Sequence, residues 1–127
     1  MLSRIATTSL RAPTALRAFS TIQVNEIASV LKLNVNDEPT AMKFDVHMKK
    51  LTEQMRAHPG FKSSTRYVCK SEWAYELSFI FADGASFGAW KESKVRDEVH
   101  ENYLLALKDC GIDEDKVYGG ARVHDKW

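Results

Sequence analysis

The order in which two hydrophobic periodicities follow one another constrains the fold of this chain most strongly. Residues 27–35 alternate between apolar and polar side chains, which is the period of a strand with one buried face. Residues 40–57 switch to apolar residues three and four positions apart, the spacing of an amphipathic helix. The rest of the chain supplies two strands, a helix and a strand, so we expect the order β-α-β-β-α-β.

The first expected helix, residues 40–57, carries signals at both ends. Its apolar stripe consists of Phe44, Met48, Leu51 and Met55. Asp37 or Thr40 can cap its start, since either side chain can accept a hydrogen bond from a free backbone N–H of the first turn. His58-Pro59-Gly60 ends it, because proline disfavours helix in the preceding residue and glycine permits a tight turn. His58 is then a helix C-terminal residue favoured by the helix dipole.

Residues 61–68 and 73–81 are expected to form a β-hairpin, because both segments alternate and a short polar segment separates them. The second strand places its bulky residues on one face: Trp73, Tyr75, Leu77, Phe79 and Phe81. Asp83-Gly84 then breaks the pattern. This hairpin supplies the two middle strands of the order above.

The last third of the chain predicts two helices and a strand. Residues 86–91 form a short helix that presents Phe87 and Trp90 together. Ser93 caps a longer helix that Gly111 terminates. Residues 116–123 form the final strand, which two adjacent glycines loosen.

This order predicts an α+β, ferredoxin-like fold, in which an antiparallel sheet carries its helices on one face. The opposite face of the sheet is then bare. It is partly apolar, because Ala28, Val30, Ala74 and Ile80 alternate away from the helix-facing residues. A second apolar face suggests a partner, most economically an identical subunit, so we expect a homodimer through the open sheet face.

The N-terminal segment, residues 1–19, has the composition of a mitochondrial presequence. It contains Arg4, Arg11 and Arg17, several Ser and Thr residues and no acidic residue. Arg17-Ala18-Phe19-Ser20 looks like a matrix-protease site, so we expect cleavage near Phe19 and a location in the mitochondrial matrix. The alternative is an amphipathic N-terminus that is never removed. Residues 20–127 are expected to form a single domain.

Composition excludes several classes of function for residues 20–127. Three of the eighteen basic residues and none of the seventeen acidic ones lie in the presequence, so the remainder is slightly acidic and no nucleic-acid partner is indicated. No apolar run approaches a membrane span, so a soluble domain is expected. Cys69 and Cys110 are expected to be free thiols in a reducing matrix. No metal site is predicted, since His47 and His124 have no companion ligand at a readable spacing.

Four stretches of this sequence resemble the antibiotic biosynthesis monooxygenase family. They are His58-Pro59-Gly60-Phe61, Glu76-Leu77-Ser78-Phe79, Phe87-Gly88-Ala89-Trp90-Lys91-Glu92-Ser93 and His100. The resemblance runs from the first strand to the last and is clearest over residues 51–107. It implies small ferredoxin-like domains whose paired sheets form a dimeric α/β barrel.

Two branches of that family imply different chemistry. One oxidises polycyclic aromatic substrates without metal or flavin, in a pocket between sheet and helices. The other degrades haem: a His on the second long helix ligates iron, a Trp packs on the porphyrin, and an Asn on the first strand bonds near the bound oxygen. Trp90 and His100 match that Trp and His in order and spacing. If the chain follows the second branch, its cofactor is haem and His100 is the residue that ligates the iron.

The Asn of the haem branch does not carry over directly. Leu31 or Lys32 stands at the matching stretch, and Asn25 or Asn34 fits only with a shift of register. The candidate catalytic residues implied by the resemblance are therefore His100, Trp90 and Asn34, with Asn34 resting on proximity alone.

His100 and Trp90 also have purely structural interpretations. His100 sits at the edge of the stripe marked by Val99 and Tyr103, where it reaches either a pocket or water. Trp90, one turn after Phe87, serves as a core anchor of the short helix.

The sequence thus predicts a mitochondrial monooxygenase for a small aromatic or porphyrin-like ligand. The alternative is a non-catalytic binding module, or an accessory subunit of a mitochondrial protein complex that docks through the open sheet face. A cavity of several hundred cubic ångströms would favour the enzyme.

Overall fold

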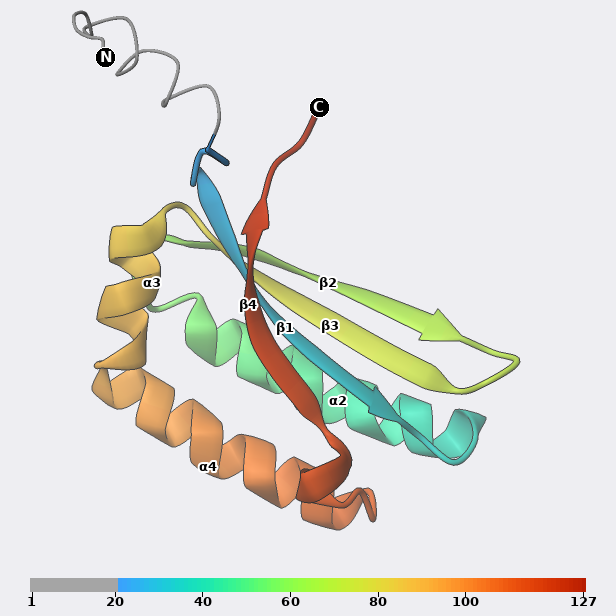
Figure 1. Ribbon diagram of the computed structural model, residues 1–127. Helices are drawn as coiled ribbons and strands as arrows, with labels where there is room; N and C mark the ends of the chain where they lie inside the picture. The colour runs from blue at the N-terminus through green and yellow to red at the C-terminus, as the bar shows by residue number, and fades with distance from the viewer. Residues whose placement is uncertain (1–20) are drawn as a thin grey trace, which may run out of the picture.

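The computed structural model describes residues 21–127 (Figure 1). The expected presequence, residues 1–19, and the expected cleavage site near Phe19 lie outside the described residues. Within residues 21–127, no helix has the length and apolar character needed to cross a membrane.

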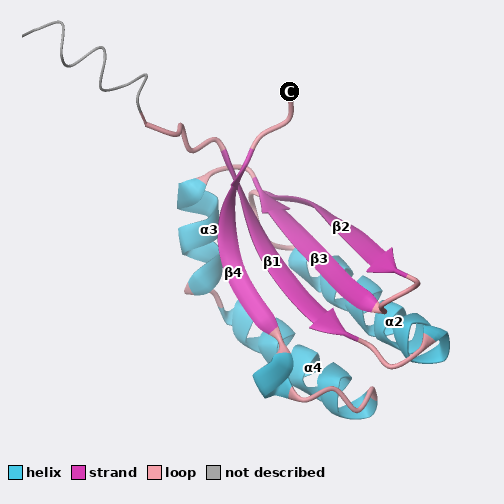
Figure 2. Cartoon of the chain, turned by 45° about the vertical axis from the view of Figure 1, so that its right-hand side comes forward, coloured by secondary structure: helices cyan, strands magenta, loops and turns pink. Residues whose placement is uncertain are grey.

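The described chain has the ferredoxin-like α+β fold that the periodicities predict. Its elements are β1 (Glu26–Asn34), α2 (Glu38–Met55), β2 (Phe61–Cys69), β3 (Ala74–Phe81), α3 (Gly84–Lys91), α4 (Lys94–Asp109), the 3-10 turn η1 (Glu114–Lys116) and β4 (Tyr118–His124). The strands form one sheet in the order β2-β3-β1-β4, and every neighbouring pair is antiparallel. The helices cover one face of the sheet and leave the other open (Figures 1 and 2).

The helix-facing side of the sheet holds the main core. Phe44, Tyr75 and Phe81 are its largest fully buried side chains. Phe44 of α2 meets Tyr75 of β3 edge to face, with ring centroids 5.0 Å apart. The expected apolar stripe of α2 is confirmed, because Phe44, Met48, Leu51 and Met55 are all buried.

Side-chain caps set the helix boundaries. Asp37, one of the two expected candidates, caps α2: its carboxylate accepts a hydrogen bond from the Thr40 N–H at 2.9 Å. The helix therefore begins at Glu38, earlier than periodicity alone indicated. Ser93 caps α4 as expected, because its hydroxyl oxygen accepts a hydrogen bond from the Arg96 N–H at 3.1 Å.

Strands β3 and β4 begin later than expected, each for a local reason. Trp73 has a φ of 54°, in the left-handed region, so it belongs to the hairpin turn and β3 begins one residue later. The segment before the last strand forms the 3-10 turn η1 instead of extended chain, because the Asp113 carboxylate caps it by accepting from the Asp115 N–H. Strand β4 therefore begins at Tyr118.

The open face of the sheet has a small apolar centre and a polar surround. Ala28, Val30 and Ile80 form a buried cluster there, apart from the main core. Strand register also places one row of residues across all four strands of this face: Tyr67, Glu76, Lys32 and Tyr118. Glu76 and Lys32 form an ion pair in the middle of that row.

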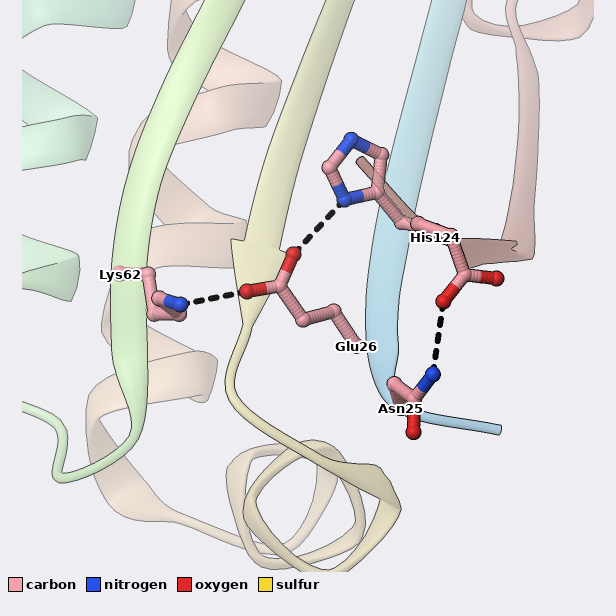
Figure 3. Close-up of polar contacts among 5 residues, drawn as sticks. Asn25, Glu26, Lys62 and His124 are labelled. Atoms are coloured by element: carbon pink, nitrogen blue, oxygen red, sulfur yellow. Dashed lines mark hydrogen bonds and ion pairs between the residues drawn. The ribbon is translucent and has the colours of Figure 1, made fainter. Parts of the chain in front are cut away.

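A charged cluster ties three strands together at one end of this face (Figure 3). Glu26, at the start of β1, accepts a hydrogen bond from Lys62 of β2 through one carboxylate oxygen. Its other oxygen lies 2.8 Å from Nδ1 of His124, at the end of β4. These hydrogen bonds lower the pKa of the Glu26 carboxyl below its ordinary value, with Lys62 contributing most.

Candidate functional site

A cavity of about 600 Å³ lies between the sheet and the helices, on the side of β4 and α4. This volume is within the usual range for sites that bind small molecules. Its lining comes from helices α2, α3 and α4, from the turn η1 and the residue after it, and from strands β1, β3 and β4: Ser29, Val30, Leu31, Met48, Leu51, Met55, Phe79, Phe87, Trp90, Lys91, Arg96, Val99, His100, Tyr103, Glu114, Val117, Gly119, Gly120 and Ala121.

Small residues on β4 create this space. Gly119 and Ala121 lie on the helix-facing side of β4, opposite Leu31 and Ser29 of β1. A Cβ placed on Gly119 would have no heavy atom within 4 Å, so the missing side chain leaves the cavity open. Larger residues at these positions would reach toward α4 and fill the gap, as core residues do elsewhere.

The walls of the cavity are apolar, with a high aromatic content. Phe87 and Trp90 come from α3 and Phe79 from β3, while Met48 and Met55 of α2 add flexible thioether side chains. Aromatic rings and methionine sulfur make favourable contacts with the faces of flat rings. The walls therefore suit a planar, largely aromatic ligand.

The mouth of the cavity is basic. Lys91, Arg96 and His100 line it with exposed side chains, whereas Glu114 is the one carboxylate among the lining residues. The Lys91 ammonium also lies 5.1 Å from the Phe87 ring centroid, which draws its charge toward the apolar wall. An excess of donors at the mouth of an apolar cavity favours a ligand that carries an acidic group at one edge.

Tyr103 adds a hydroxyl group to the wall near this mouth. Burial raises its pKa to about 12, with a further contribution from the Glu114 carboxylate. The Tyr103 hydroxyl is therefore protonated at neutral pH and can donate a hydrogen bond. Its ring centroid lies 6.0 Å from that of His100, one turn earlier on α4.

The structure brings two of the three sequence-predicted residues together. Trp90 of α3 and His100 of α4 line the same cavity. Asn34 does not line it: its side-chain amide donates to the backbone oxygen of Glu72 at 3.3 Å, near the hairpin turn. The reason is strand alternation, since Leu33 faces the core and Asn34 therefore faces the open side of the sheet.

Trp90 is held by the core as well as facing the cavity. It is 7% exposed, and its ring lies 5.8 Å from that of Phe81 and 5.4 Å from that of His58, between centroids. His58 is itself buried, and its Nε2–H donates to the backbone oxygen of Ser86 at 3.1 Å. The expectation of a terminal His58 serving the helix dipole is thus incomplete, because the ring ties the end of α2 to α3.

The His-Pro-Gly turn also fits α3 sterically. Gly60 has a φ of +92°, and a Cβ on it would lie 2.2 Å from Oγ of Ser86. Only glycine allows this close approach. The turn therefore fixes the position of α3 and, through it, that of Trp90.

Sequence reasoning identified His100, but it missed Lys91, Arg96 and Glu114 at the mouth and gave Tyr103 only as a marker of the buried stripe. Arg96, His100 and Tyr103 recur at intervals of four and three on α4, so they share one helix face. That spacing was a signal for the site, but it coincides with the edge of the buried stripe. Lys91 and Glu114 carried no sequence signal, because they reach the mouth from α3 and from the turn η1.

The donor set fits haem in part. His100 is the one histidine of the lining, and Lys91 and Arg96 could pair with the carboxylates of a porphyrin. Strand β1 contributes Ser29, Val30 and Leu31 and no amide side chain. The lining residues could therefore bind a porphyrin, but none of them is an amide that could donate a hydrogen bond to iron-bound oxygen, as the Asn of the haem branch does.

No family model and no curated protein sequence matches this chain. Solved structures do. A monooxygenase of Streptomyces coelicolor, crystallised with the ligand nanaomycin D, aligns with a TM-score of 0.62 at 16% identity, over 82% of this chain and 90% of its own. SnoaB, a cofactor-independent oxygenase from Streptomyces nogalater, aligns with a TM-score of 0.56 at 13% identity, over 81% and 94%.

A third similar structure bears on assembly. It is a dimeric ferredoxin-like protein of unknown function from Jannaschia sp. CCS1, with a TM-score of 0.55 at 13% identity, over 76% of this chain and 97% of its own. The chain shares its fold with these proteins. At such identities the comparison concerns the fold alone, and chemistry has to be argued from the cavity.

Proposed function

We propose that this protein is a mitochondrial monooxygenase whose substrate is a planar aromatic molecule with an acidic group at one edge. The observation that carries the proposal is the cavity of about 600 Å³, which combines aromatic walls with a basic mouth. Its position between sheet and helices, in a fold shared with two oxygenases, supports the same class of reaction.

The residues of the cavity suggest a division of labour. Trp90 and Phe87 would contact the face of the aromatic rings, while Lys91 and Arg96 would hold the acidic edge at the mouth. His100 would accept a proton from a phenolic hydroxyl, because a ring nitrogen of its imidazole can act as a general base at the mouth. The resulting anion gives up an electron to molecular oxygen more readily than the neutral phenol, so the basic mouth favours the oxidisable form.

The presequence composition supports a place in the mitochondrial matrix, and the open sheet face supports a homodimer. Tyr67 is 64% exposed and Tyr118 47% exposed on that face, around the buried cluster of Ala28, Val30 and Ile80. Exposed tyrosines are typical anchors of protein interfaces. The dimeric similar structure points the same way.

A non-catalytic role remains the second candidate, and the position of Asn34 favours it. With Asn34 on the open face, the cavity has no counterpart of the oxygen-directed amide of the haem branch. A binding module would use the cavity without turnover. An accessory subunit of a mitochondrial complex would dock through the open sheet face in place of a second copy.

Calorimetric titration of the full chain with 1-hydroxy-2-naphthoate and with 1-naphthol tests ligand binding. We expect the carboxylated ligand to bind at least about tenfold more tightly, because the neutral one leaves the basic mouth unpaired. The Arg96→Gln variant should reduce that preference, and the Lys91→Gln/Arg96→Gln double variant should remove it. Equal binding of both ligands, or none, would overturn the proposed ligand class.

Oxygen uptake separates the enzyme from the binding module. An anthrone carboxylic acid, which combines a flat ring system, an acidic edge and an enol tautomer with a phenolic hydroxyl, should consume oxygen faster with the protein than without it, and His100→Ala should slow this step. Binding without oxygen uptake would favour the binding module. Titration with haemin, followed at the Soret band, tests the porphyrin alternative: a saturable shift lost in His100→Ala would assign His100 as an axial ligand.

A further inference from the structure

A second cluster of reactive side chains lies away from the cavity, where α2 meets the C-terminal end of α4. Nε2 of His47 lies 2.7 Å from Oδ2 of Asp109, and Cys110 follows directly in the chain. One nitrogen, one carboxylate oxygen and one sulfur of these three residues lie within 4.8 Å of one another. None of the three lines the cavity.

The tertiary fold creates this cluster. His47 precedes the buried Met48 on α2, whereas Asp109 is the last residue of α4 and Cys110 is its C-cap. The Cys110 N–H donates to the Ala106 backbone oxygen at 3.0 Å, so the final helical turn fixes the backbone from which the thiol projects. The carboxyl end of a helix presents partial negative charge, which favours a cation at this position.

The donor types indicate the class of cation. Imidazole nitrogen, carboxylate oxygen and thiolate sulfur together are the ligands of zinc and similar borderline metals, whereas magnesium and calcium prefer oxygen alone. His47 and Asp109 retain access to water, and the Cys110 Sγ makes no hydrogen bond among the described residues. We propose that His47, Asp109 and Cys110 form a three-ligand zinc site with water in the fourth position.

Zinc binding at this site requires side-chain rotations. A tetrahedral zinc ion with bonds of about 2.1 Å to nitrogen and oxygen holds these atoms about 3.4 Å apart. His47 and Asp109 would therefore separate slightly from their present 2.7 Å, and the sulfur would move inward. Asp109 is exposed, but its carboxylate is held by Lys43 and His47; Cys110 is buried and His47 half-buried.

The Lys43 ammonium opposes zinc binding at this cluster, so its removal is the most discriminating test of the site. Its Nζ lies 3.3 Å from Oδ1 of Asp109 and 3.1 Å from the Asp109 backbone oxygen. In the metal-free protein this ammonium offsets the carboxylate, and it would repel an incoming divalent cation. If the cluster only links α2 to α4, Lys43→Met removes an ion pair and changes no metal affinity. If the cluster is a zinc site, Lys43→Met tightens zinc binding.

The experiment uses the untagged full chain, stripped of metal with a chelator. We expect one Zn²⁺ per chain by calorimetry. Co²⁺ should give the intense near-ultraviolet absorption of a thiolate-bound ion and the visible bands of four-coordination. Cys110→Ser should abolish the thiolate band, and His47→Ala should weaken Zn²⁺ binding at least about tenfold. Lys43→Met should strengthen it several-fold.

Matched controls separate this site from adventitious binding and from misfolding. Cys69→Ser and His124→Ala remove the other thiol and a histidine of the sheet end, and both should keep full affinity. Circular dichroism checks that each variant is folded, and Zn²⁺ should raise the Tm of the unaltered chain but not that of His47→Ala. Equal affinity in Cys110→Ser, or weaker binding in Lys43→Met, would overturn the zinc site.

Discussion

Gly119 pairs with Leu31 across β4 and β1, and a Cβ on Gly119 would project into open space inside the cavity. A Gly119→Val substitution should therefore fill part of the cavity without distorting the strand. We expect binding of 1-hydroxy-2-naphthoate to fall at least about tenfold, while stability stays level or rises by up to about 1 kcal/mol, because valine favours strands. Calorimetry and urea unfolding of the same samples measure both effects.

The neighbouring glycine is the matched control for this prediction. Gly120 lines the cavity with its backbone, but a Cβ on it would point to the open side of the sheet and lie 2.8 Å from the Tyr118 hydroxyl. Gly120→Ala should displace that flexible side chain and leave ligand affinity unchanged. A loss of affinity in Gly120→Ala equal to that in Gly119→Val would show that the effect arises from the strand and not from the cavity.

Substitutions of Trp90 and His100 should have different effects on stability and on ligand binding. Trp90→Ala removes a ring packed on Phe81 and His58, so we expect a loss of about 3–5 kcal/mol in the free energy of unfolding. His100→Ala removes an exposed side chain and should change stability by less than about 0.5 kcal/mol while weakening the binding of the carboxylated ligand. Denaturant unfolding at one pH compares the two. A large loss of stability in His100→Ala would contradict its place at the mouth.

The Glu26 cluster should give the protein an acid-dependent stability. The hydrogen bonds from Lys62 and His124 hold the Glu26 pKa below its ordinary value of 4.5. Because the folded pKa is the lower one, this stabilisation is fully present above the unfolded pKa and is lost as the pH falls through the folded pKa. Glu26→Gln should therefore be less stable than the unaltered chain near neutral pH, and the difference should shrink in acid.

Urea midpoints measured from about pH 7 down to about pH 3 follow this difference. Glu72→Gln is the control, because this exposed carboxylate lies outside the cluster at the far end of the sheet. A gap between Glu26→Gln and the unaltered chain that stays constant over the whole range would refute the role given to the Glu26 carboxylate.

The homodimer can be tested on the row of residues that crosses the open face. Tyr67→Glu combined with Tyr118→Glu places two charges there, and burying them in an interface is costly. We expect the unaltered chain to sediment as a dimer and the double variant as a monomer. Val46→Glu, on the exposed surface of α2, should leave the dimer intact. A monomeric unaltered chain would favour a different partner for this face.

Local signals in the sequence were enough to predict the fold. Alternation in residues 27–35 and the spacing of Phe44, Met48 and Leu51 report which side of each element is apolar, and this property survives any tertiary arrangement. Asp37 and Ser93 cap helices through hydrogen bonds within one turn. Trp73 was predicted as a strand residue. Its left-handed conformation follows from the geometry of the turn, and tryptophan rarely adopts it, so the sequence carried no signal for it.

The sites depended on contacts between residues far apart in the chain. From the sequence alone, Trp90 and His100 could be paired because their order and spacing resemble those of the antibiotic biosynthesis monooxygenase family. Only the packing of α3 and α4 against β4 creates a cavity beside them. Strand alternation places Asn34 on the opposite face of the sheet. The packing of α2 against α4 brings His47, which has no possible metal ligand at a readable spacing in the sequence, close to Asp109 and Cys110. Periodicity fixes which face a side chain occupies, whereas the sheet order and the helix packing decide what it meets there.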